Sequence, residues 1–190
     1  MATAVATRPL TYDDLAAFEE NDGNRYEIFG GVLTVSASPA ERHSWVSTHL
    51  LVALANYIHQ HKLGAVYHAP VDVRLTDFDI VVPDLIFLRE ERRHIYSGRE
   101  VVEGAPDLIV EVLSPSTRSR DLTVKMDLYA RTGVREYWIV DPETSSISVY
   151  SRTAIGSFES VPLTEGLVRS IVVEGFALRP EDVFPATATE

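Results

Sequence analysis

Two acidic side chains interrupt apolar runs of this sequence: Glu111 within residues 108–113, and Asp84, directly after Pro83, within residues 80–88. Burying a carboxylate without a partner is costly, so each must meet a cation or reach water. If the two strands are neighbours, the carboxylates form an oxygen-ligand site of the kind that suits Mg²⁺ or Mn²⁺. The alternatives are a structural ion pair for Glu111 and a turn residue for Asp84.

A lysine is predicted to approach the same place. Lys125 lies three residues after Leu122 and four before Tyr129, on the apolar stripe of a helix predicted over residues 121–132. A lysine that points from this stripe at two sheet carboxylates can orient or deprotonate a water. It can also offset the negative charge of a phosphoryl transition state while a metal polarises the scissile phosphate. The alternative is a lysine at the edge of the stripe whose ammonium reaches solvent.

The elements that must position these residues alternate between helices and strands. Their order indicates a mixed α/β sheet with helices on its faces. Helices are predicted over residues 11–22, 44–61 and 121–132, with a helical turn over 180–184. Strands are predicted over residues 26–29 and 32–35, which form a hairpin, and over 65–68, 71–75, 80–88, 107–113, 136–140, 147–152, 158–161 and 168–173, while 89–103 is predicted as a charged loop.

The length and composition fit one globular domain. The chain has 190 residues, against about 150 residues for a typical domain. We therefore predict a single domain over residues 1–190 with its core at about 25–152. There is no cysteine, which excludes disulfides, thiolate zinc sites and a thiol nucleophile, and fits a reducing compartment.

The charge excludes a general nucleic-acid coat protein. The chain carries 17 Lys and Arg against 28 Asp and Glu, a net charge of −11, whereas phosphate binding depends on Lys and Arg. The longest stretch without these four residue types, residues 43–61, holds too many polar side chains to span a bilayer. The N-terminal residues 2–10 show no signal-peptide pattern. We therefore expect a cytoplasmic protein without a membrane segment.

Several stretches of the sequence resemble one family. They are residues 105–117 (APDLIVEVLSPST), Arg120 and Asp121, Lys125, Tyr129, and residues 133–142 (GVREYWIVDP), with residues 26–28 (YEI), His43 and residues 82–85 (VPDL) in addition. Together they closely resemble the Uma-type family of putative restriction endonucleases, within the PD-(D/E)XK nuclease superfamily, over about residues 10–180. The resemblance implies a restriction-endonuclease-like α/β fold, here with an N-terminal helix and hairpin and extra C-terminal strands.

Carried over position by position, the resemblance makes Asp84 the motif aspartate, Glu111 the second acid and Lys125 the lysine. The simple motif places its lysine two residues after the second acid, where this chain has Leu113. The lysine must then come from the following helix, a displacement that the resemblance also suggests. Glu27, His43 and Asp107 match family positions that can line the site. For each of these three, the alternative is an ordinary strand, helix-start or turn residue.

Other catalytic sites are not indicated. Ser114 and Ser116 lack the Gly-x-Ser-x-Gly elbow of a hydrolase, and Ser-Pro-Ser is typical of a turn before a helix. His59 and His61 are two residues apart, whereas ligands on one helix face need a spacing of three or four. The sequence has no phosphate-binding glycine loop. We therefore expect neither a zinc site nor a nucleotide cofactor.

The leading hypothesis is a Mg²⁺- or Mn²⁺-dependent endonuclease that hydrolyses phosphodiester bonds in DNA. The alternative is a non-catalytic nucleic-acid-binding or assembly module that keeps the nuclease fold. The negative net charge favours the module, whereas the retained acids and lysine favour the enzyme. A DNA path would have to be built locally from Arg89, Arg92, Arg93, Arg118 and Arg120, with Arg118 and Arg120 as possible phosphate contacts.

Two expectations follow about assembly and geometry. The strand around Trp138 and the tail strands exceed what a minimal nuclease core requires, and enzymes that cut both strands of a duplex often pair two sites, so we expect a homodimer. The Asp84 and Glu111 carboxylates should lie on the same side of the sheet, with the Lys125 ammonium beside them.

Overall fold

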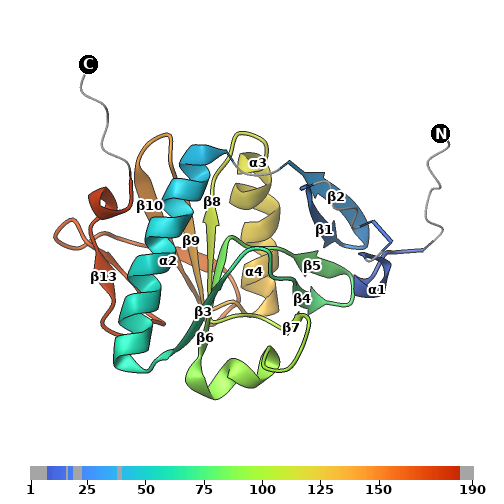
Figure 1. Ribbon diagram of the computed structural model, residues 1–190, viewed down its shortest axis with the longest axis horizontal. Coiled ribbons are helices and arrows are strands. Elements are labelled where there is room, and N and C mark those ends of the chain that lie inside the picture. Colours follow the sequence, from blue (N-terminus) through green and yellow to red (C-terminus); the bar gives the residue numbers. More distant parts are fainter. Residues whose placement is uncertain (1–7, 16, 19–22, 38–39, 185–190) are drawn as a thin grey trace.

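The structure, a computed structural model, describes residues 8–15, 17–18, 23–37 and 40–184 and confirms the mixed α/β class (Figure 1). Residues 21–22, at the predicted end of the first helix, lie outside this range. The helical elements are α1 (Tyr12–Leu15), α2 (Glu41–His61), η1 (Glu90–Ile95), α3 (Arg118–Arg120), η2 (Asp121–Lys125), α4 (Met126–Thr132) and η3 (Pro180–Asp182). The strands are β1 (Arg25–Phe29), β2 (Val32–Ser36), β3 (Gly64–His68), β4 (Val73–Thr76), β5 (Asp79–Val81), β6 (Leu85–Arg89), β7 (Val102–Glu103), β8 (Leu108–Val112), β9 (Glu136–Asp141), β10 (Ser146–Arg152), β11 (Phe158–Val161), β12 (Val168–Arg169) and β13 (Ala177–Leu178).

The described strands form three sheets. The largest has six strands in the order β11-β10-β9-β8-β6-β3, in which only the central pair β8 and β9 is parallel. A five-stranded sheet has the order β2-β1-β5-β4-β7, and β12 pairs with β13. The predicted hairpin of β1 and β2 is present, with Gly30 and Gly31 in its turn.

The strand predicted over residues 80–88 is divided between β5 and β6, which belong to different sheets. Pro83 has no N–H and cannot extend a ladder. The N–H of Val82 donates to the Glu27 carboxylate at 3.0 Å rather than to a neighbouring strand. Asp84 therefore lies where the chain crosses from one sheet to the other.

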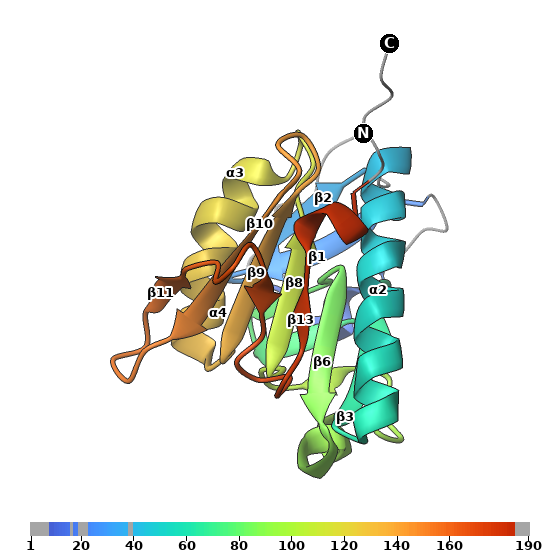
Figure 2. The same cartoon turned by 90° about the vertical axis from the view of Figure 1, so that its left-hand side faces the viewer.

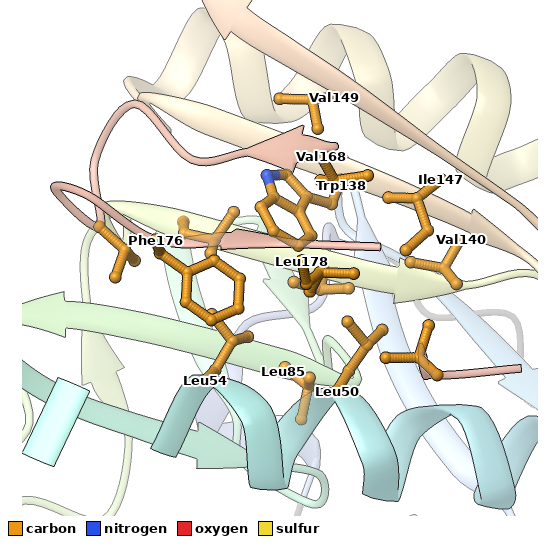
Figure 3. Close-up of a cluster of buried hydrophobic side chains, with 14 of the residues drawn as sticks. Leu50, Leu54, Leu85, Trp138, Val140, Ile147, Val149, Val168, Phe176 and Leu178 are labelled. Atoms are coloured by element: carbon orange, nitrogen blue, oxygen red, sulfur yellow. The ribbon is translucent and has the colours of Figure 1, made fainter. Parts of the chain in front are cut away.

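Helices cover both faces of the six-stranded sheet, with α2 on one side and α4 on the other (Figure 2). On the α2 side, Leu50 and Leu54 pack in one apolar cluster with Leu85 and Trp138 (Figure 3). Because side chains alternate along a strand, β8 gives residues 108, 110 and 112 to this cluster, and Ile109 to the cluster beside α4. Glu111 shares the face of Ile109. No described helix is long and apolar enough to cross a membrane.

The extra C-terminal segment packs on the α2 side of the sheet, where Phe176 and Leu178 join the cluster around Trp138. Buried Glu136 on β9 fastens it: its carboxylate accepts the Trp138 indole N–H and the backbone N–H groups of Ile171 and Val172. These two N–H groups are thereby withdrawn from strand pairing. For this reason the strand predicted over residues 168–173 is shortened to β12.

The helix predicted over residues 121–132 begins earlier and is irregular. It runs through α3, the π-helical turn η2 and α4 without interruption. A π turn adds one residue to the helical repeat, and here it buries both Asp121 and Lys125. Leu122, predicted on the stripe that faces the sheet, is instead 39% exposed. The apolar stripe was thus wrong at Leu122, although Lys125 does face the sheet.

Candidate active site

Asp84, directly before β6, lies next to Glu111 of the antiparallel strand β8. The register pairs Ile86 with Ile109 and Leu85 with Val110, and one step further brings Asp84 opposite Glu111. Both side chains are almost fully buried. The geometry expected of the two acids is therefore what the structure has, with both carboxylates lining one pocket.

The Arg25 guanidinium, the His43 imidazole and one backbone N–H hold Asp84. The Arg25 guanidinium donates to Oδ1 at 2.9 Å, His43 Nε2 to Oδ2 at 3.1 Å and the Val112 N–H to Oδ2 at 2.8 Å. Burial by itself raises the pKa of Asp84, but the His43 hydrogen bond and the charge of Arg25 outweigh it and lower that pKa to about 2. Asp84 is thus ionised at any ordinary pH.

Lys125 is the shared cation of three carboxylates. Its Nζ lies 2.8 Å from Glu111 Oε1, 3.0 Å from Glu27 Oε1 and 3.5 Å from Asp121 Oδ1, and its side chain is 2% exposed. The Tyr129 hydroxyl donates to the same Glu111 oxygen at 2.7 Å. Burial opposes charging, but the three surrounding carboxylates prevail and raise the pKa of Lys125. The ammonium therefore stays protonated.

The π turn supplies Asp121, a site residue that the sequence reasoning did not single out. It lies four residues before Lys125, on the same side of the turn. An acid four residues before a buried lysine is the signal that was present in the sequence. The Tyr137 hydroxyl donates to the Asp121 backbone carbonyl at 3.1 Å and so anchors the turn to β9.

Arg25 is the second site residue that the sequence reasoning missed. It is the first residue of β1 and contacts Asp84, from which it is separated by 59 positions along the chain. No local pattern marks it, because only the packing of the hairpin against the β5-to-β6 crossing brings it to the acids.

The three residues expected to line the site, Glu27, His43 and Asp107, are placed differently. Glu27 and His43 lie in the pocket with Asp84. Asp107 lies beyond the opposite end of β8 and does not line the pocket. It accepts the backbone N–H of Arg89 and forms an ion pair with Arg92 at 2.9 Å. Its expected role at the site is therefore corrected: it fastens the loop that precedes β8.

The two possible phosphate contacts are already paired with other groups. Arg118 lies 2.8 Å from Asp141 and its side chain is 41% exposed. Arg120 is 18% exposed and lies 3.5 Å from Glu27 Oε2, and it also donates to Ser36. Arg118 is thus the more accessible of the two.

The donor chemistry of the pocket fits a hydrated Mg²⁺ or Mn²⁺ ion. Four carboxylates line it, those of Glu27, Asp84, Glu111 and Asp121, and hard divalent cations prefer such oxygen ligands. Within the described ranges no group of three or more His, Cys, Asp or Glu side chains is arranged to hold a metal ion. Mg²⁺ retains several waters and needs only one or two carboxylates, and Asp84 and Glu111 are the pair that would hold it.

The buried acids of the pocket lead to a prediction of how stability depends on pH. Burial, reinforced by the charges of Asp121, Asp84 and Glu27, raises the pKa of Glu111 to about 8 against the opposing charge of Lys125. The folded chain then keeps a proton that the unfolded chain releases near its ordinary value of 4.5. Stability falls with rising pH wherever the folded state binds more protons.

We therefore expect the free energy of unfolding to decrease from about pH 5 to about pH 8. The Glu111→Gln variant, which has no such proton to lose, should show a smaller decrease. Urea unfolding at several pH values measures both slopes. Equal slopes in the two proteins would contradict the predicted protonation of Glu111.

Comparisons with known proteins bear on the family and the fold of the chain. A family described as “Uma2: Putative restriction endonuclease” matches residues 11–181. Among solved structures, a crystal structure described as a putative nuclease belonging to DUF820, from Anabaena variabilis ATCC 29413, has a TM-score of 0.76 at 19% identity and covers 93% of this chain and 98% of that one. At that identity the likeness shows the fold alone. No curated protein matches the chain. The resemblance noted in the sequence, and the fold that it implies, are confirmed.

Proposed function

Because this chain belongs to the Uma2 family, described as “Putative restriction endonuclease”, we propose that it is a Mg²⁺- or Mn²⁺-dependent endonuclease that hydrolyses phosphodiester bonds in DNA. The observation that carries the proposal is the meeting of Asp84, Glu111 and Lys125 in one pocket. The proposal places the enzyme in the cytoplasm, since a chain without cysteine suits reducing conditions.

In the proposed mechanism Asp84 and Glu111 would hold the divalent cation. When bound, this cation polarises the scissile phosphate and acidifies a water molecule. Lys125 stays protonated, so its role is to orient Glu111 and to balance negative charge rather than to accept a proton. Tyr129 fixes the same Glu111 oxygen from the other side. Arg118 is exposed and lies beside Asp141, the last residue of β9. It is the proposed contact to a DNA phosphate.

Cleavage of supercoiled plasmid and of single-stranded DNA with Mg²⁺ or Mn²⁺ tests the proposal. Loss of an outer partner of a metal ligand costs about 10–100-fold, so Glu111→Ala, which removes a ligand, should lose at least about 100-fold in rate. Asp107→Asn is the matched control, since it alters a buried acid at the far end of the same strand. It should cleave at the rate of the wild-type protein.

A non-catalytic assembly module is the competing function, and the net charge of −11 favours it. Absence of cleavage by the wild-type protein on both substrates, with either metal, would establish this alternative. Equal rates for wild type and Glu111→Ala would instead identify a contaminating nuclease as the source of cleavage.

We also propose a homodimer, because two copies related by a two-fold axis present two sites to the two strands of a duplex. Sedimentation at micromolar concentration should give a species of twice the 21.1 kDa chain mass. A monomer across the concentration range would contradict this part of the proposal.

A further inference from the structure

The pocket carries a cation at each of its two main acids. Lys125 lies against Glu111, and Arg25 lies against Asp84. A divalent ion shared by both acids would occupy a region that already holds two positive charges. Arg25 donates to Asp84 Oδ1 at 2.9 Å, so an ion that takes Asp84 as a ligand would compete with the guanidinium for the charge of this carboxylate.

The basic side chains that contact the acids of the pocket, Lys125, His43 and Arg25, differ in their exposure to solvent. The Lys125 side chain is 2% exposed and has three carboxylate neighbours. The His43 side chain is 10% exposed and the Arg25 side chain 20%. Arg25 is thus the most accessible of the three, and it reaches Asp84 by the long flexible side chain of a residue at the start of a strand.

Loss of the Arg25 contact leaves Asp84 hydrogen-bonded. His43 Nε2 and the Val112 N–H both donate to Oδ2, whereas Arg25 donates to Oδ1. The guanidinium can therefore leave while the carboxylate keeps its two hydrogen bonds at Oδ2. Oδ1 would then be the oxygen that is offered to another cation.

A guanidinium released at this point lies beside the proposed reaction. Arginine matches phosphate oxygens with two parallel N–H donors. The pocket also holds four carboxylates, which repel a phosphodiester, and its lysine, Lys125, is held among three of them. A guanidinium that moves from the carboxylate to the phosphate therefore balances negative charge in both the metal-free and the substrate-bound state.

We propose that Arg25 is an exchangeable cation, which pairs with Asp84 until a divalent ion binds. It neutralises Asp84 when no metal is bound; when Asp84 and Glu111 hold a divalent ion, the guanidinium would leave Asp84 and contact the scissile phosphate. This inference rests on the proposed function and adds a residue that contacts the substrate. Arg25 and the metal compete for Asp84, so removal of Arg25 has opposite effects on metal affinity and on cleavage.

Titration calorimetry with Mn²⁺ alone tests the competition without any substrate. Couplings between binding events are typically 5–150-fold in affinity, so Arg25→Met should bind Mn²⁺ at least about fivefold more tightly than wild type. Arg25→Lys, which keeps the competing charge, should show no such gain. At saturating Mn²⁺, cleavage by Arg25→Met should fall by about 100-fold, the scale of a lost charge-stabilising donor.

The matched control is Arg74→Met. Arg74 forms a two-bonded ion pair with Glu103 outside the pocket, so this variant should keep both the wild-type Mn²⁺ affinity and the cleavage rate. Melting curves verify that each variant is folded. If Arg25→Met does not fold, Arg25→Gln takes its place, because glutamine removes the charge and still donates a hydrogen bond.

The outcomes separate this inference from the proposed function. Suppose that wild type binds Mn²⁺ and that Arg25→Met binds it equally or more weakly. This result would overturn the exchange and leave the nuclease proposal standing. A merely structural Arg25 predicts that weaker affinity. Wild type that binds no Mn²⁺ would remove the proposed metal site, and the exchange with it.

Discussion

Lys125→Met is expected to lower the free energy of unfolding by about 3–5 kcal/mol at neutral pH, as removal of one partner from a buried ion pair does. The variant leaves the carboxylates of Glu111, Glu27 and Asp121 without the ammonium that they share. Lowering the pH should restore part of the loss, because the stranded carboxylates then take up protons. Urea unfolding gives the measurement.

Replacement of the acid rather than the lysine should lower the free energy of unfolding much less. Glu111→Gln leaves Lys125 between Glu27 and Asp121, so we expect a smaller loss than for Lys125→Met. In the double variant the glutamine removes one of the three acids that lose their shared ammonium, and stability should exceed that of Lys125→Met alone. The chain's other lysine, exposed Lys62, is the matched control. Equal costs for Lys125→Met and Lys62→Met would show that the shared ammonium is not a major stabilising group.

The second large expected effect is stabilisation by metal. Free Mg²⁺ or Mn²⁺ at 100 times its dissociation constant should add about 2.7 kcal/mol to the free energy of unfolding. For a chain of this size that corresponds to an increase of about 5–10 °C in the melting temperature. Burial, and after it the neighbouring acids, raise the pKa of Glu111, and a bound ion would offset both by favouring the charged carboxylate.

Glu111→Ala should lose most of this metal-dependent shift. Without metal it should be nearly as stable as wild type, because one member of a crowded set of acids is gone while Lys125 keeps two partners. Asp107→Asn should retain the full shift. A wild-type protein that shows no shift, together with a strongly destabilised Glu111→Ala, would make Glu111 a structural ion-pair partner and favour the assembly module.

Local patterns sufficed for much of the fold and for the three central residues. An acid inside an apolar strand must have a partner, which is why Asp84 and Glu111 stand out without any structure. Helical spacing placed Lys125 on the side that faces the sheet, although the π turn that buries it is not visible in that spacing. The paired glycines predicted the hairpin of β1 and β2.

The same patterns could not predict which end of a strand lies at the site. Asp107 and Glu111 share a face by the period of two, yet four residues separate them by roughly 13 Å along the strand. The period assigns a face but does not say which end of the strand the site occupies. That choice depends on the pairing of β6 with β8 and on the arginines that collect at Asp107.

The amino-acid sequence by itself indicated that the two acids of the candidate site need a partner on burial, and it placed Lys125 on the helix face toward the sheet. Only the tertiary structure decided which cations satisfy them. Arg25 reaches Asp84 across 59 positions, and Asp121 turns inward through the π-helical repeat. Burial preferences act on each residue locally, whereas ion pairing depends on distances in space, and these arise only when the hairpin, the crossing from β5 to β6 and the helix pack together.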